Sequence, residues 1–282
     1  MTAAALTLVL ASGLCHATWN LMAKSSGNKA AFLWICQLIA FALFLPWTIW
    51  EMGDWSITPE AGVYAAASAA LHGLYVWLLA RAYTIGDLSQ AYPIMRGTSP
   101  LLVPLGAVLL FGQHVSPWGW VGIAGIVIGI AALQEPKRGG AAWKIGKPAA
   151  YAFAVGLTVT CYTLVDAQAL QYVPAVVLNM AGNIGNAMAL TAAALAGGAA
   201  RAEWAQYKRS VIAAGILAPA GYLLFLFALH YGPVSLLTPV REIGTVFGTI
   251  GAIWLLKEQQ GFRRIMASIV ITCGIIVLGL TG

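Results

Sequence analysis

The sequence predicts an all-α integral membrane protein with ten transmembrane helices, arranged as two inverted five-helix repeats. Of its 282 residues, 60% are hydrophobic and only 9% are charged, whereas about 25% of the residues in a soluble domain are charged. The apolar residues form blocks of about 20, which is the length of a helix that spans a bilayer. The placement of the basic residues predicts the inversion, as described below.

Glycine, proline and charged residues separate the apolar blocks and set the boundaries of the spans. The ten predicted spans cover residues 3–23, 30–50, 61–81, 88–111, 117–134, 148–169, 174–197, 209–230, 234–256 and 262–281. No basic segment precedes the first block, so we expect a retained span rather than a cleaved signal peptide. A polar linker, residues 135–147, divides a first repeat, 1–134, from a second, 148–282.

Two stretches in the fourth and ninth spans support a duplication. "GDLSQAYPIMRG" from Gly86 aligns without a gap with "GPVSLLTPVREI" from Gly232. The alignment pairs identical residues at three positions, namely Gly86 with Gly232, Ser89 with Ser235 and Pro93 with Pro239. These stretches occupy corresponding places in the two halves, which favours a repeat of five spans.

The basic residues predict that the second repeat is inverted. A repeat with an odd number of spans enters the membrane upside down the second time, as in many secondary transporters. Every Lys and Arg except Arg96 and Arg241 falls in or beside a loop that follows an odd-numbered span. The positive-inside rule then places the linker in the cytoplasm and both termini outside. We expect a multi-pass protein of the inner, cytoplasmic membrane.

The charged residues inside spans are candidates for substrate binding. The repeat alignment pairs Arg96 with Glu242 and Met95 with Arg241. A charge at the centre of a membrane helix costs about 2.5–3.5 kcal/mol on insertion scales, so such residues tend to be functional. One interpretation is a structural Arg96–Glu242 ion pair that joins two helices. In the other, Arg96, Arg241 and Glu242 form a substrate site, where a guanidinium binds a carboxylate or a phosphorus oxyanion.

Uncharged and aromatic residues extend this candidate substrate site. The spacing of His16, Trp19 and Asn20 puts them on one face of the first span, where they either contact substrate or pack against a neighbouring helix. Aromatic and histidine side chains in other spans are candidates for a cavity wall, although tyrosine also packs between helices; these are His72, Tyr75, Tyr92 and Tyr222.

Proton coupling has three candidate residues, His16, Asp166 and Glu242. Histidine titrates near neutral pH, and a buried carboxylate would serve the same purpose. Asp166 lies near the predicted end of the sixth span, where a solvated carboxylate would have no special role. Only burial would make Asp166 a coupling residue.

Three stretches together resemble the ten-span EamA-type family of the drug/metabolite transporter superfamily. They are "HATWNLMAK" (16–24), "AYTIGDLSQAYPIMRGTSPLLVPLGAVLLFGQ" (82–113) and "LLKEQQ" (255–260). The resemblance covers essentially the whole chain and implies a central cavity, lined by spans 1, 3, 4, 6, 8 and 9, with alternating access. Gln113 stands where the family usually has Glu. The resemblance also implies cytoplasmic termini, the opposite of the orientation that the charges predict.

The sequence contains no Walker motif, no Gly-x-Ser-x-Gly and no His-Glu-x-x-His, so we expect neither an enzyme nor a cofactor or metal. Its basic residues are scattered, which argues against nucleic acid. We expect a secondary transporter for a small polar or amphiphilic metabolite, amino-acid-like or another organic anion. A membrane-embedded enzyme and a lipid-binding assembly protein are the alternatives. The expected partners are the substrate, membrane lipids and, through small residues such as those of "GIAGIVIG" (122–129), a second copy.

Overall fold

The apolar blocks of the sequence form helices throughout the part of the chain that the structure describes. A computed structural model describes residues 1–53, 55–85, 88–133, 147–256 and 262–281, and these contain helices and no strand. The helices are α1 (Ala3–Lys24), α2 (Lys29–Gly53), α3 (Pro59–Ile85), α4 (Leu88–Phe111), α5 (Pro117–Ala132), α6 (Lys147–Ala169), α7 (Ala175–Leu195), the 3-10 turn η1 (Ala196–Gly198), α8 (Ala199–Ala228), α9 (Val234–Val240), α10 (Ile243–Leu256) and α11 (Phe262–Thr281).

Local sequence signals explain several helix starts. The Ser116 hydroxyl accepts a hydrogen bond of 2.9 Å from the Gly119 amide at the start of α5, and Pro117 occupies the first turn, where its missing N–H costs nothing. The Asn28 side chain accepts a hydrogen bond of 3.0 Å from the Ala31 amide at the start of α2. Such caps satisfy amides that have no partner within the helix.

Two predicted spans differ from the helices observed. The eighth helix begins at Ala199, ten residues before the predicted start at 209, and it is kinked at Tyr207, where φ is −121° and ψ is 18°. The predicted ninth span, 234–256, is broken into α9 and α10 at Arg241 and Glu242. Hydropathy predicted neither difference. The first turns of α8 are too polar to count as part of a span, and an apolar segment keeps its hydropathy whether or not its helix is broken.

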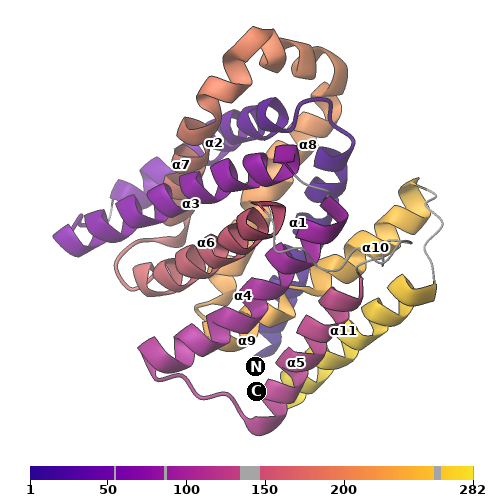
Figure 1. The fold of residues 1–282 in the computed structure, drawn as a ribbon. Helices are drawn as coiled ribbons and strands as arrows, with labels where there is room; N and C mark the ends of the chain where they lie inside the picture. Colours follow the sequence, from indigo (N-terminus) through magenta and orange to yellow (C-terminus); the bar gives the residue numbers. More distant parts are fainter. Residues whose placement is uncertain (54, 86–87, 134–146, 257–261, 282) are drawn as a thin grey trace.

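The helices of the two halves interdigitate rather than forming separate bundles (Figure 1). The most extensive contacts join α5 to α11, α1 to α8, α3 to α6, α3 to α7, α2 to α8, α2 to α7, α4 to α6 and α1 to α10. This set is unchanged when α1, α2, α3, α4 and α5 exchange places with α6, α7, α8, α9–α10 and α11. The packing therefore has an approximate two-fold relation between the first five helices and the rest.

Contacts between connecting segments define two opposite faces of the bundle. On the face that we call the Trp55 face, the Trp55 indole donates to the Tyr172 carbonyl. The described ends of the chain lie on the same face, since Thr2 donates to the Tyr231 carbonyl and Ser116 to that of Thr281. All of these segments follow even-numbered helices or end the chain, and none of them carries Lys or Arg.

We call the opposite side the Glu203 face. The Glu203 carboxylate is buried there, and it accepts hydrogen bonds of 3.2 and 2.7 Å from the amides of Gly27 and Asn28. Arg263 donates to the Ala132 carbonyl at 3.0 Å on this face. The helix ends that meet on the Glu203 face carry the basic residues Lys24, Lys29, Arg201 and Arg263. The charge asymmetry seen in the sequence therefore corresponds to two sides of the bundle.

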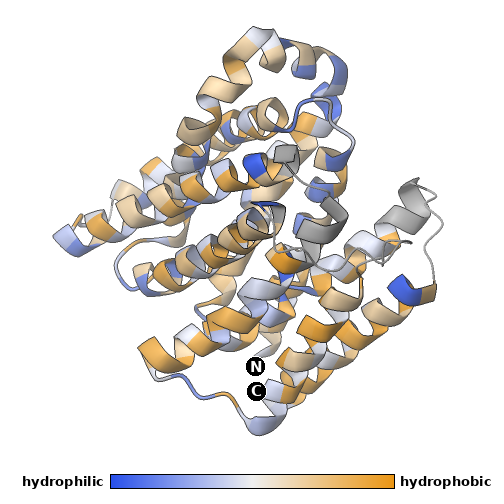
Figure 2. Ribbon diagram, viewed as in Figure 1, coloured by the Kyte–Doolittle hydropathy of each residue, from blue (hydrophilic) through white to orange (hydrophobic). Residues whose placement is uncertain are grey.

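The outer surface of the bundle is apolar. Figure 2 shows hydrophobic residues along the helices, and Leu109, Met188 and Phe262 each expose more than 70% of their surface. Seven helical segments of the described chain, one of them running from Ala175 to Ala228, have the length and hydropathy of a membrane span. The 16-residue α5 is apolar but shorter. Lipid is the medium that such a surface requires.

Small residues allow close helix packing inside the chain. A Cβ on Gly122 of α5 would lie only 2.8 Å from the Gly274 carbonyl oxygen of α11, and a Cβ on Gly274 would lie 2.7 Å from that of Gly122. The small-residue spacing of 122–129 therefore serves contact between α5 and α11 of the same chain. A second copy is not needed to explain it, and a homodimer stays a prediction.

Candidate substrate site

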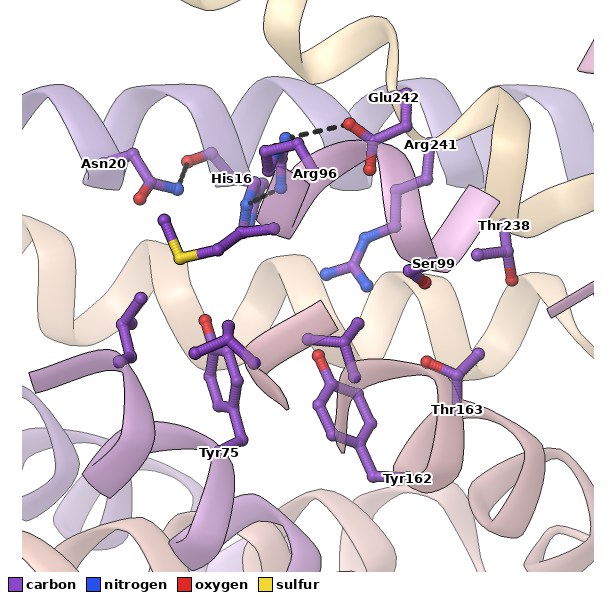
Figure 3. Close-up of a pocket in the computed structure, with 14 residues that line it drawn as sticks. His16, Asn20, Tyr75, Arg96, Ser99, Tyr162, Thr163, Thr238, Arg241 and Glu242 are labelled. Atoms are coloured by element: carbon purple, nitrogen blue, oxygen red, sulfur yellow. Dashed lines mark hydrogen bonds and ion pairs between the residues drawn. The ribbon is translucent and has the colours of Figure 1, made fainter. Parts of the chain in front are cut away.

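A cavity lies at the centre of the bundle, where five segments meet. Its walls come from α1, α3, α4, α6 and the region around the α9–α10 break (Figure 3). All five segments belong to spans 1, 3, 4, 6 and 9, which the family resemblance implied as cavity-lining spans. The eighth span was also expected to line it, but α8 contributes no lining residue.

An ion pair between the two halves forms one side of the cavity. The Nη2 atom of Arg96 on α4 lies 3.3 Å from the Glu242 Oε2 atom, and both side chains are at least 80% buried. The Arg96 Nη1 atom donates a hydrogen bond of 2.8 Å to Nε2 of His16 on α1. Because Nε2 accepts this bond, His16 is neutral in this arrangement. The pairing of Arg96 with Glu242 expected from the repeat alignment is present.

Arg241 differs from Arg96 because it forms no ion pair with the described residues; the neighbouring Glu242 carboxylate, which pairs with Arg96, attracts Arg241 only from beyond ion-pair distance. No side chain or carbonyl of the described residues forms a hydrogen bond or ion pair with its guanidinium, and its Nε atom is buried without a partner. Its Cζ atom lies 4.6 Å from the ring centre of Phe225 and 5.4 Å from that of Tyr222. Figure 3 shows the guanidinium pointing into the cavity. Such stacking orients a cation without neutralising it.

The cavity is therefore net positive, with two guanidinium groups and one carboxylate in its wall. Hydroxyl groups complete the polar lining. Tyr75 and Tyr162 point their hydroxyls into the cavity from the side opposite Arg96 (Figure 3), while Ser99, Thr163 and Thr238 lie at its other end. The Thr238 Oγ1 atom is buried without a hydrogen-bond partner. A bound anionic group would find both charge and hydrogen-bond donors here.

The break between α9 and α10 places Arg241 and Glu242 at the cavity. Pro239 is one source of the break, since it has no amide to donate within the helix. The other is close packing of α1, because a Cβ on Gly244 would lie 2.9 Å from the Gly13 carbonyl oxygen. The paired segment α4 contains Pro93 and yet remains one helix from Leu88 to Phe111. Broken helices at mid-membrane are a feature of transporter binding sites.

A second polar cluster lies beside the cavity, between α3, α6 and α8. Asp166 is fully buried, contrary to the solvated position that its place near the end of span 6 first suggested. Its Oδ2 atom accepts a short hydrogen bond from the Tyr222 hydroxyl and lies 3.9 Å from His72 Nε2. The His72 ring stacks on Tyr162 at a centroid distance of 4.2 Å.

The predicted site residues divide between these two places. The cavity wall contains His16, Asn20, Tyr75, Arg96, Arg241 and Glu242. His72 and Tyr222, which we expected in the cavity wall, lie in the second cluster. Trp19 packs edge-on against His16 at 5.2 Å and does not line the cavity. The Tyr92 side chain lies outside the described residues.

Sequence reasoning missed the small hydroxyl residues of the cavity, Ser99, Thr163 and Thr238. Serine and threonine are common in membrane helices, where their hydroxyls bond to the backbone of the same helix, so their presence alone carries no signal. One signal was available: Thr238 lies three residues before Arg241 and so belongs on the same helix face.

Comparison with known proteins decides the family. The sequence profile of the EamA-like transporter family matches residues 3–133 and again 146–280. The chain belongs to this family. EamA-family membership makes it a multi-pass membrane transporter of the drug/metabolite type, as the quoted motifs predicted. EamA proteins are transporters rather than enzymes, which agrees with the expectation drawn from the missing catalytic motifs.

The EamA fold is also that of a solved structure. A protein crystal structure matches with a TM-score of 0.79 and 15% sequence identity, over 99% of this chain and 98% of that chain. At this identity the match establishes the fold alone. No curated protein matches the sequence.

Proposed function

We propose that this EamA protein is a secondary transporter that carries a small organic anion or amino-acid-like metabolite across the cytoplasmic membrane by alternating access. The observation that carries the proposal is Arg241, a cation that points into the central cavity and forms no ion pair or hydrogen bond with the described residues. A guanidinium in that state offers a fork of donors that matches a carboxylate or a phosphorus oxyanion.

Arg96 and Glu242 give the site a second mode of binding. A substrate anion at Arg241 lies next to the Arg96–Glu242 pair, so it can draw Arg96 away from Glu242. The freed carboxylate would then be able to accept an ammonium group, as an amino acid carries. Competition of this kind makes an ion pair part of the transport cycle rather than a fixed brace.

Alternating access fits an architecture of two inverted five-helix repeats, 1–134 and 148–282, joined by the linker 135–147. Three observations support the repeat. The pattern of helix contacts is the same when the two halves exchange places, the family profile matches each half separately, and loops with basic residues alternate along the chain with loops that have none. In inverted-repeat transporters the substrate site lies near the membrane midplane, between the repeats. A cavity lined by helices of both halves supports this assignment.

The orientation follows from charge. The Glu203 face carries the basic residues, so we place it in the cytoplasm and the Trp55 face outside. Reporter domains fused in turn to the C-terminus and into the linker test this placement. Protection of the linker reporter and accessibility of the C-terminal reporter from outside are expected. The reverse pattern would refute the orientation and leave the repeat intact.

The transport proposal is tested with the purified protein reconstituted in lipid vesicles. Radiolabelled L-alanine, L-aspartate, succinate and inorganic phosphate serve as probes, and uptake is measured by counterflow. At least one anion or amino acid should be exchanged by the wild type, and Arg241→Ala should abolish that exchange at a substrate concentration that half-saturates the wild type. Arg201→Ala, which removes an exposed arginine of the Glu203 face, is the matched control and should transport normally. Exchange that is equal in both variants would overturn the site.

A further inference from the structure

The Asp166 carboxylate has one oxygen, Oδ1, without a hydrogen-bond partner of normal geometry among the described residues, and the buried Ser68 hydroxyl of α3 is a further polar neighbour of this carboxylate. Asp166 itself is fully buried. The neighbouring Oδ2 atom has both of the contacts described above, with Tyr222 and His72. An ionised carboxylate with one bare oxygen is costly inside a membrane protein. A proton on Oδ1 removes that charge.

We propose that Asp166 binds and releases the proton that drives transport, with His72 and Tyr222 as its polar partners. The proposal rests on the proposed transport function and names its energy source. It also selects among the three coupling candidates. His16 already uses Nε2 to accept from Arg96, and Glu242 is paired with the same arginine. Asp166 has no such fixed cation.

The surroundings of Asp166 suit a proton better than a metal ion. Tyr222 presents a hydroxyl donor to it, whereas a metal site would present several converging oxygens. The titratable groups that face Asp166 are His72 from α3, Tyr222 from α8 and Tyr162 from α6 itself. Of the other helices packed on α6, α9 has no titratable side chain, and the only one described on α4 is Arg96, which pairs with Glu242.

Tyr222 connects the proton site to the substrate site. Its hydroxyl donates to Asp166, and the Arg241 Cζ atom lies 5.4 Å from the centre of its ring. An anion bound at Arg241 and an ionised Asp166 would be two negative charges separated by one tyrosine. Because they repel in a poorly solvated interior, binding of the anion favours the protonated form of Asp166. Linkage makes the effect reciprocal, so one proton and one anion move together.

A hollow on the Trp55 face gives water a route toward Asp166. It is lined by Gln113, Gln168 and Gln171, together with apolar residues that include Ala167. Ala167 and Gln168 follow Asp166 directly along α6, so solvent comes within one helical turn of the carboxylate. In the proposed orientation this face is external, and the arrangement is that of a proton-driven importer.

Infrared difference spectroscopy of the full-length protein in detergent tests the proton site without requiring transport. A pH titration of the wild type should show the carbonyl band of a protonated buried carboxylic acid. Asp166→Asn should lose this band, and Glu242→Gln should keep it. Persistence of the full band in Asp166→Asn would overturn the proposal, whatever the transport assays show.

The coupling is tested by repeating the titration with saturating L-aspartate, succinate or inorganic phosphate. At least one of these anions should raise the wild-type midpoint by about one pH unit, a tenfold linkage. Arg241→Ala should keep the band but lose the shift, because the anion no longer binds. Tyr222→Phe preserves the ring and its packing while removing the hydroxyl, and it should reduce the shift. A shift of wild-type size in Tyr222→Phe would contradict coupling through this residue.

Failure of the transport function looks different from failure of the proton site. If none of the anions binds, the band remains, Asp166→Asn still removes it, and only the shift is missing. If Asp166 binds no proton, anions still exchange in vesicles and the band is unaffected by Asp166→Asn. Uptake that depends on a sodium gradient and is unchanged in Asp166→Asn would also reject the proton site.

Discussion

The two polar clusters of this protein are one tyrosine apart and have opposite electrostatic imbalances. The cavity cluster contains two guanidinium groups and one carboxylate, so it carries surplus positive charge. The Asp166 cluster contains one carboxylate, a neutral phenol and a histidine, so its only fixed charge is negative. Each imbalance is costly inside a membrane. An anion would correct the first and a proton the second, and the protein can bind both from water.

The sharpest test of the difference is removal of one carboxylate from each cluster. Glu242→Gln removes the carboxylate that pairs with Arg96 while the hydrogen bond to His16 remains, and loss of one member of a buried ion pair typically costs about 3–5 kcal/mol of unfolding free energy. Asp166→Asn leaves no fixed cation unpaired, so its cost should be clearly smaller. Chemical unfolding in mixed micelles measures both. An Arg96→Met/Glu242→Gln double variant should lose less stability than the two single variants together.

A second test compares the two arginines of the cavity cluster. Arg241→Ala removes the cation that forms no ion pair, and two charge-assisted hydrogen bonds of about 1.5 kcal/mol each to a bound anion correspond to roughly 100-fold weaker anion binding. Arg241→Lys keeps the charge but loses the two parallel N–H donors of the guanidinium, so anion binding should become about tenfold weaker. Counterflow at varied substrate concentration gives both values. Wild-type affinity in the lysine variant would show that charge alone, without the fork, determines binding.

His16 offers a test of how Arg96 is held. Replacement by Leu removes the acceptor of a 2.8 Å hydrogen bond and leaves a buried donor unsatisfied, with a cost of about 1–3 kcal/mol. His16→Gln retains an acceptor near the same place and should recover part of that loss. The unfolding free energies of the two variants are compared with the wild type. Equal losses would mean that packing, not the hydrogen bond, explains the effect.

The smallest expected effect concerns the packing behind His72. A Cβ on Gly182 of α7 would lie 3.2 Å from the His72 ring, so Gly182→Ala should displace the ring and cost about 1 kcal/mol. Gly125→Ala is the matched control, since a Cβ on Gly125 would lie 3.6 Å from the Gly274 Cα atom, a normal van der Waals distance. The alanine at 125 should be neutral or slightly stabilising. Thermal unfolding in detergent distinguishes the two.

The sequence predicts where most helices lie along the chain, but it does not predict how each helix is rotated about its own axis. Apolar blocks located α1 at 3–23, against Ala3–Lys24 observed, and the repeat alignment identified the Arg96–Glu242 pair before any distance was known. The sequence does not show which faces of α3 and α8 point toward the cavity. His72 and Tyr222 therefore appeared to belong with the cavity, although they face Asp166.

The break after α9 was also beyond sequence reasoning. Pro239 aligns with Pro93, and one lies in a broken segment while the other lies in an unbroken helix. The difference arises from what packs alongside, since α1 approaches the break closely at Gly13 and Gly244. A single sequence shows neither the neighbour nor its distance. The same limit hid the burial of Asp166, which depends on three helices that are distant in sequence.

The break has an electrostatic consequence of its own. It brings the negative end of the α9 dipole and the positive end of the α10 dipole together at the cavity. Fields from opposed helix ends cancel at a distance and are felt within about one turn. The backbone therefore contributes little to attracting a substrate from the aqueous phase. The backbone at the break acts only at short range, on a group that has already entered the cavity. Attraction of a substrate from water therefore depends on the charged side chains of this segment, and the backbone contributes only to recognition inside the cavity.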